Sequence, residues 1–144
     1  MIAIDSNILL RYLLNDDPEQ SLKAAKIIQG QEKVLITDVV LVETIWTLKG
    51  KKYKLEKQAI IDVLHALFAE PNLFFEDNQT VWKAMSDYAN AKQIKVGSKW
   101  KSADFPDALI VNKANLLAKT LKQSMEGVYT FDVAAQALKG TVKA

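Results

Sequence analysis

Cysteine is absent from the 144-residue chain, and histidine occurs only once, at His65. Without cysteine the chain can form no disulfide, thiolate nucleophile or cysteine zinc site, and a single histidine excludes a multi-histidine metal centre. No apolar run approaches the roughly 20 residues that a transmembrane helix needs. These absences exclude a disulfide scaffold and a membrane-spanning helix.

The composition is that of a globular protein. Hydrophobic residues make up 49% and charged residues 25% of the sequence, which excludes a disordered chain or a fibre. A mass of 16.1 kDa corresponds to about one domain. Because no basic segment precedes the apolar start at residues 1–4, we expect no secretory signal and a cytoplasmic location.

The charges are nearly balanced in number but are unevenly distributed. Nineteen basic and 17 acidic residues give a net charge of +2. Residues 92–101 contain four lysines and no acid, and residues 49–57 contain five lysines and one glutamate. Two interpretations stay open at this point, a face that attracts a polyanion and a solvated lysine-rich surface.

Short apolar runs alternate with segments of helical spacing along the chain. Such alternation predicts βαβ units, in which helices cover both faces of a central parallel sheet. The fold class is therefore α/β, with one three-layer α/β/α domain over residues 1–144. The expected strands are 2–4, 34–36, 73–75 and 128–131, and the expected helices are 6–14, 18–30, 38–50, 55–69, 79–94 and 104–117, with a polar loop at 95–103 and a short helix after residue 132.

Four carboxylates stand among apolar neighbours in the sequence, where an uncompensated charge is costly. Two are expected at the carboxyl ends of strands and two in early helical turns, positions that meet at one edge of a parallel sheet. Their mutual repulsion would be relieved by a hard divalent cation, magnesium or manganese. Such sites hydrolyse phosphodiesters with water as the nucleophile. The four residues are Asp5, Glu43, Asp107 and Asp132.

Each aspartate also has a purely structural interpretation. Asp5 can hydrogen-bond its own turn, Asp132 can cap the last helix, and Asp107 stands three residues after Asp104 with the spacing of a capping box. Glu43 lies too far into its helix to be a cap. If all four acids were structural, their meeting at one predicted edge of the sheet would be a coincidence. The sequence therefore favours a functional site.

The segments around these acids resemble the motifs of PIN-domain proteins, above all the VapC-type toxins of prokaryotic toxin–antitoxin pairs. The resemblance begins with Asp5-Ser6-Asn7-Ile8-Leu9-Leu10-Arg11-Tyr12-Leu13-Leu14. It continues, in family order, through Val42-Glu43, Asp104-Phe105-Pro106-Asp107-Ala108-Leu109-Ile110 and Tyr129-Thr130-Phe131-Asp132. It therefore covers nearly the whole chain. Pro106 replaces the usual alanine, and Val133-Ala134-Ala135 replaces the usual continuation, so we expect the last strand to be short or absent.

The resemblance implies a metal-dependent endoribonuclease that uses one or two Mg²⁺ or Mn²⁺ ions and cuts structured RNA such as transfer or ribosomal RNA. It also implies a homodimer and a VapB-like antitoxin that covers the acidic site. In its terms Asp5, Glu43, Asp107 and Asp132 are the catalytic and metal-binding quartet, Asp104 is an accessory acid, and Asn7 and Thr130 are supporting polar residues.

Basic and aromatic residues near the acids are candidates for RNA contact. Trp100 could stack a base while Lys99 and Lys101 contact phosphates; the alternative is a tryptophan folded onto the core. Arg11 could bind a phosphate or an acidic partner, or form a surface salt bridge. We expect Trp46, like Trp82, to be a core or interface residue, and the leucines of residues 9–14 to supply a dimer or antitoxin surface beyond what the core needs.

Two other functions compete with a ribonuclease. One is a PIN-fold module that binds RNA or a protein without cleavage, which loss of an acid would favour; no acid is lost. The other is a phosphatase or response-regulator-like domain. Asp5-Ser6-Asn7 lacks the second aspartate that a phosphatase would need, and the strand at 128–131 has no lysine at its end, as a response regulator would need.

Overall fold

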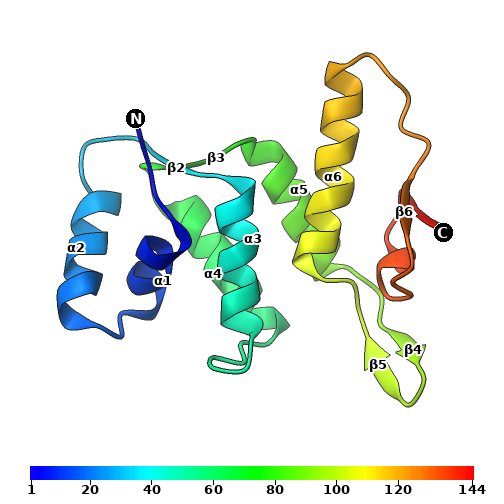
Figure 1. Ribbon diagram of the computed structural model, residues 1–144, viewed down its shortest axis with the longest axis horizontal. Coiled ribbons are helices and arrows are strands. Elements are labelled where there is room, and N and C mark those ends of the chain that lie inside the picture. Colours follow the sequence, from blue (N-terminus) through cyan, green and yellow to red (C-terminus); the bar gives the residue numbers. More distant parts are fainter. The chain divides into compact units, whose positions relative to one another are not determined.

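The computed structural model describes all residues from 1 to 144 (Figure 1). The chain forms two compact units, Met1–Asn78 and Gln79–Ala144, called here unit 1 and unit 2. None of the helices is both long and apolar enough to cross a membrane.

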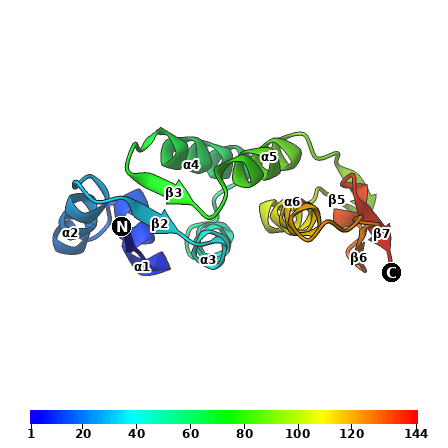
Figure 2. The same ribbon diagram turned by 90° about the horizontal axis from the view of Figure 1, so that it is seen from above.

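Unit 1 contains a three-stranded parallel sheet in the order β1-β2-β3. Figure 2 shows α4 on one side of the strands and α1 and α3 on the other. The predicted α/β class, with helices on both faces of a parallel sheet, is therefore confirmed. The elements are β1 (Ile2–Ala3), α1 (Ser6–Leu14), α2 (Pro18–Ile28), β2 (Val34–Ile36), α3 (Asp38–Lys49), α4 (Lys57–Ala69) and β3 (Leu73–Phe75).

The register of this sheet follows the apolar runs of the sequence. Val34 lies between Ile2 and Leu73 in neighbouring strands, and Ile36 lies opposite Phe75. Strands of a parallel sheet are apolar because helices cover the sheet. Fully buried aliphatic side chains from the strands and helices form the core of the unit. They include Leu9, Ile28, Val34, Ile36, Leu41, Ile45, Leu48, Ile60, Leu64 and Leu67.

Three of the four helices of unit 1, α1, α2 and α3, begin after a residue whose side chain accepts a hydrogen bond from the first turn. Asp17 accepts a hydrogen bond from the backbone N–H of Gln20 at 2.9 Å, and Pro18 takes the first helical position of α2. Thr37 caps α3 through the N–H of Val40, and Gly50 is the C-cap after the last helical residue, Lys49. These boundaries agree with the sequence prediction, whereas α2 ends at Ile28, before the expected Gly30.

Unit 2 holds the rest of α5 (Asn78–Ala89), which begins on the last residue of unit 1, and α6 (Phe105–Thr120). The rings of Tyr88 and Phe105 meet edge to face with centroids 6.2 Å apart, and both side chains are buried. The remaining elements are β4 (Ile94–Val96), β5 (Lys99–Lys101), β6 (Val128–Thr130), the 3-10 helix η1 (Ala135–Ala137) and β7 (Thr141–Lys143).

The segment 95–103 is not the polar loop that its composition predicts. Residues 94–96 and 99–101 pair as the antiparallel hairpin β4–β5. The helix expected over 79–94 ends at Ala89, so Ile94 lies on a strand instead of a helix. The missed signal is the alternation Ile94-Lys95-Val96 followed by a two-residue Gly-Ser loop, which is typical of a hairpin.

The strand predicted near the end of the chain exists, and its partner is β7. The two strands are parallel and joined through η1, with Val128 opposite Thr141. The last strand, which the sequence predicted to be short or absent, is present with three residues. A Cβ at Gly127 would overlap the side chain of Val142, so glycine is what permits this close approach.

Candidate functional site

Unit 1 carries two of the predicted acids, and both side chains are exposed. Asp5 follows β1 after the buried Ile4 and is the N-cap of α1; its Oδ1 accepts a hydrogen bond from the backbone N–H of Ile8 at 3.0 Å. Ser6 is the first helical residue of α1 and is buried. Asp5 takes the cap position because its backbone is extended there.

Glu43 lies in the second turn of α3, between the half-buried Val42 and the buried Thr44. Its side chain makes no hydrogen bond within unit 1 and faces solvent. Helices α1 and α3 pack against each other in this unit. The apolar neighbours of Glu43 in the sequence therefore do not surround its carboxylate, because successive helical residues project in different directions.

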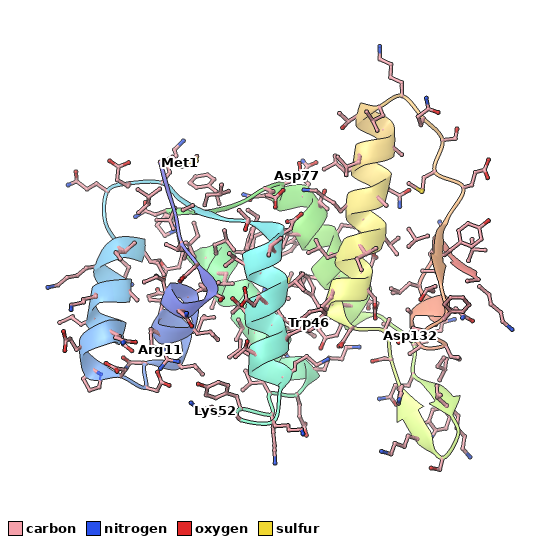
Figure 3. All side chains as sticks on the ribbon, viewed as in Figure 1. Met1, Arg11, Trp46, Lys52, Asp77 and Asp132 are labelled. Carbon is pink, nitrogen blue, oxygen red and sulfur yellow. The ribbon has the colours of Figure 1, made fainter.

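Unit 2 carries the other two acids. Asp107 is half-buried in the first turn of α6, where its Oδ2 accepts a hydrogen bond from the N–H of Asp104 at 3.0 Å. Asp132 is exposed after β6, and its Oδ1 accepts a hydrogen bond from the N–H of Ala135 at 2.9 Å. The N–H of Asp132 donates to the Thr130 hydroxyl at 3.0 Å, so Thr130 orders the turn that presents this carboxylate. Asp132 is labelled in Figure 3.

The three aspartates share one arrangement. Each uses a single carboxylate oxygen to accept a hydrogen bond from a backbone N–H three residues away. This contact orients the side chain on a rigid turn, and the second oxygen of Asp5 and of Asp132 makes no hydrogen bond within its own unit. The structural interpretation and the functional one are therefore compatible, because capping occupies only one of the two oxygens.

The chemistry of this donor set suits a hard divalent cation. Carboxylate oxygens are the ligands that Mg²⁺ and Mn²⁺ prefer, and the chain has no cysteine and one histidine. Neither unit by itself gathers three histidine, aspartate or glutamate side chains that could hold a metal ion. Each unit contributes two acids, and the expectation that all four meet at one sheet edge stays a prediction. Asn7 lies exposed on the first turn of α1, next to Asp5 in unit 1.

A family model for the PIN domain matches residues 2–136. The chain belongs to the PIN domain family. The match extends over both units and includes all four acids. PIN domains are in general a nuclease fold and typically use divalent metal ions. A search of curated proteins finds no match to this PIN domain.

The lysines predicted to contact RNA lie in the hairpin of this PIN domain. Trp100 is 64% exposed, so it is not part of the core. Side chains alternate between the two faces of a strand, and Trp100 therefore projects from the face opposite to Lys99 and Lys101. Lys95 lies directly across from Trp100 and shares its face. Lys95 was not among the residues predicted to contact RNA. The sequence predicted a loop at this segment, and a loop would not place Lys95 opposite Trp100.

Arg11 has an acidic neighbour in the structure. Its Nη1 lies 2.9 Å from Oδ1 and 3.1 Å from Oδ2 of Asp16, just beyond the end of α1. Figure 3 labels Arg11. This is the surface salt bridge that the sequence left open as an alternative. Both side chains are partly exposed, so an incoming phosphate would compete with Asp16 for the same guanidinium group.

The predicted apolar contact residues differ in exposure. Leu9 and Leu10 are buried within unit 1, and the other two leucines of α1 are half-buried, so this helix uses its apolar stripe for its own core. Trp46 is 62% exposed on α3 and Trp82 is 49% exposed on α5. Neither tryptophan is a core residue.

Proposed function

We propose that this PIN domain is a metal-dependent endoribonuclease that cleaves structured RNA, either transfer or ribosomal RNA, and acts as a VapC-type toxin. The observation that carries the proposal is the complete acidic quartet on a chain of the PIN family. A PIN fold that only binds RNA or protein would not need all four acids.

Asp5, Glu43, Asp107 and Asp132 would hold one or two Mg²⁺ or Mn²⁺ ions. Three of these side chains are exposed and the fourth is half-buried, so their oxygens are accessible to an ion. A divalent ion bound in this way promotes ionisation of a water and offsets charge that develops on the scissile phosphate. The support for joint action of the four acids is their match to the family motifs in order.

Backbone hydrogen bonds would position the carboxylates of the three aspartates before RNA binds. The backbone N–H groups of Ile8, Asp104 and Ala135 each hold one carboxylate in a fixed orientation. Such preorganisation lowers the cost of assembling a charged site when the substrate binds. Lysines 99 and 101, in the hairpin that precedes Asp104, would raise the local concentration of a polyanion.

The proposal includes two protein partners. A VapB-like antitoxin would cover the acids, and a second copy of the chain would complete a homodimer. The exposed Trp46, one helical turn after Glu43, is a surface that either partner could cover. A toxin of this kind would act in the cytoplasm, where its RNA substrates are.

The test uses two aspartates that play the same structural role. Asp5 caps α1 and Asp17 caps α2, each through an N–H three residues ahead. Asparagine caps a helix about as well as aspartate, so Asp5→Asn and Asp17→Asn should both keep the fold. A pool of transfer and ribosomal RNA is incubated with each purified protein and Mg²⁺ or Mn²⁺, and the cut sites are mapped.

We expect site-specific, metal-dependent cuts from the unmodified chain and from Asp17→Asn, and none from Asp5→Asn. Equal cutting by all three proteins would indicate a contaminating ribonuclease. No cutting by any of them, with metal shown to bind, would favour the binding-module function over the enzyme.

A growth experiment tests the toxin role separately. Induced expression of the unmodified chain without a partner should arrest growth, whereas Asp5→Asn should not. Normal growth with abundant folded, RNA-cleaving protein would contradict the toxin assignment and leave the ribonuclease in place.

A further inference from the structure

The β4–β5 hairpin presents two chemically different faces. Lys95 and Trp100 form one face as a directly opposed pair, called here the Lys95–Trp100 face. Ile94 and Val96 lie on the other face together with Lys99 and Lys101. Ile94 and Val96 are half-buried, whereas both residues of the Lys95–Trp100 face are exposed, so this face is open to solvent over its whole pair. Figure 1 shows the hairpin extending away from α6 and β6.

A tight turn holds these two side chains together. Gly97 has φ of +64°, while Ser98 keeps a negative φ. A two-residue loop with glycine in this conformation at its first position is a type II′ turn, whose twist matches that of the strands. Lys95 and Trp100 are therefore held opposite each other by backbone pairing.

The hairpin has the composition of a nucleic-acid contact. Residues 92–101 contain four lysines and no acid, so nothing in the segment offsets its positive potential. An indole that is 64% exposed leaves a large apolar ring in water and offers its face to a planar partner. Proteins that bind single strands combine cations that track the backbone with aromatic rings on which bases stack.

We propose that the Lys95–Trp100 face is a binding platform for an unpaired base of RNA, with the base stacked on Trp100 and the adjoining phosphate paired with Lys95. The choice of RNA over another polyanion rests on the proposed ribonuclease function. Only Ser102 and Ala103 separate the hairpin from Asp104, where α6 begins. The platform would therefore select substrates with an unpaired nucleotide near the cleaved bond, such as a loop.

The first experiment makes Trp100 report its own contact. The full chain with Trp46→Phe and Trp82→Phe has Trp100 as its only tryptophan. It is titrated, with EDTA present, with a 2′-O-methylated oligouridine of about ten nucleotides, which spans one typical single-strand site. A stacked base should quench the indole fluorescence. The matched control, Trp46→Phe with Trp100→Phe, keeps an aromatic ring at residue 100. It should retain most of the binding, while the fluorescence of its only tryptophan, Trp82, does not change.

Affinity variants then test each partner of the pair. Trp100→Ala should weaken binding of the oligouridine roughly five- to hundredfold, as loss of one stacked base does, and Trp100→Phe should restore most of it. The logarithm of the affinity falls as the logarithm of the salt concentration rises. Lys95→Ala should make this negative slope shallower by about 0.7, the value for one single-strand phosphate contact. Lys139→Ala, at an exposed lysine outside the hairpin, should leave the slope unchanged.

Three results would overturn the platform: no quenching of the sole Trp100, equal quenching by the same strand in a duplex, or quenching by acidic lipid vesicles or acidic peptides but not by RNA. Because EDTA prevents metal-dependent cleavage, these results are independent of the nuclease. If RNA quenches Trp100 but the enzyme does not cleave, only the proposed function is refuted. If the enzyme cleaves RNA specifically but Trp100 fluorescence does not change, only the platform is refuted.

Discussion

Asp107 and Asp104 bind each other's backbone at the start of α6. The Asp107 Oδ2 accepts a hydrogen bond from the N–H of Asp104 at 3.0 Å, and the Asp104 side chain accepts one from the N–H of Asp107. This reciprocal capping box satisfies two N–H groups that the helix leaves without intrahelical partners. Asp107 therefore has a structural role in addition to the metal-binding role proposed for it.

The two roles of Asp107 can be separated by two substitutions. Asp107→Asn keeps an oxygen that can accept the Asp104 hydrogen bond but removes the negative charge, so we expect a small change in stability and a loss of cleavage. Asp107→Ala removes both, and should also lower the free energy of unfolding by about 1 kcal/mol. Urea denaturation and RNA cleavage measure the two effects. Full activity in Asp107→Asn would exclude this carboxylate from the site.

Glu43 is expected to be dispensable for folding and essential for cleavage. Its exposed side chain makes no hydrogen bond within unit 1, so Glu43→Gln should change the free energy of unfolding by no more than about 0.5 kcal/mol, with any change towards stabilisation if the four acids repel one another. Cleavage should be abolished. Glu126→Gln, at another exposed glutamate, should leave cleavage unchanged, and a Glu43→Gln enzyme as active as this control would contradict the proposal.

Stability should fall in alkaline solution because of a partly buried tyrosine in unit 1 and a buried tyrosine in unit 2. Burial, and then the hydrogen bond that the Tyr12 hydroxyl donates to Glu70, raise the pKa of Tyr12 above its ordinary value of 10.0. Burial alone raises the pKa of Tyr88. Above pH 10 the unfolded chain loses these protons first, so the unfolded state binds fewer protons and stability decreases as pH rises towards the folded-state pKa values. Below pH 10 these two groups contribute no pH dependence.

Tyr12→Phe should therefore reduce the alkaline loss of stability, although it lowers stability at neutral pH by removing the Glu70 contact. The measurement is chemical denaturation at a series of pH values on either side of the ordinary tyrosine pKa. Tyr129→Phe, which removes an exposed hydroxyl, is the control and should keep the slope of the unmodified chain. An identical slope in all three proteins would refute the role of Tyr12.

Arg11 can be tested through its salt bridge. If the guanidinium contacts RNA, then Asp16→Asn removes a competing carboxylate 2.9 Å away and should strengthen RNA binding, whereas Arg11→Gln should weaken it. Loss of this partly exposed pair should change the free energy of unfolding by less than about 1 kcal/mol. Unchanged RNA affinity in both variants would leave the salt bridge as the only role of Arg11.

Much of the fold was predictable because it is decided within a few residues. Helix α2 begins at Pro18 and α3 begins at Asp38, as predicted, since a cap needs only one side chain and an N–H three residues away. The strands of unit 1 coincide with the apolar runs, because a parallel sheet covered on both faces has no polar side. The four acids could be singled out in the same way, from their immediate neighbours in the sequence.

The hairpin could not be predicted from its composition. Lysine and tryptophan in one short segment suggested a polar loop, yet Lys95 and Trp100 pair across two strands. Composition does not reveal such a pair. The position of the turn at Gly97 sets the register of the two strands, and a shift of this register by one residue would move every side chain to the other face.

The sequence by itself determined most helix boundaries, the three parallel strands of unit 1 and the identity of the four candidate acids, because each depends on neighbouring residues. Only the tertiary structure decided that β6 pairs with β7, that Trp46 and Trp100 face solvent, and that Arg11 binds Asp16. Strand pairing and exposure depend on which segments meet after the chain has closed its loops, and that choice reflects the free energy of the whole packed unit.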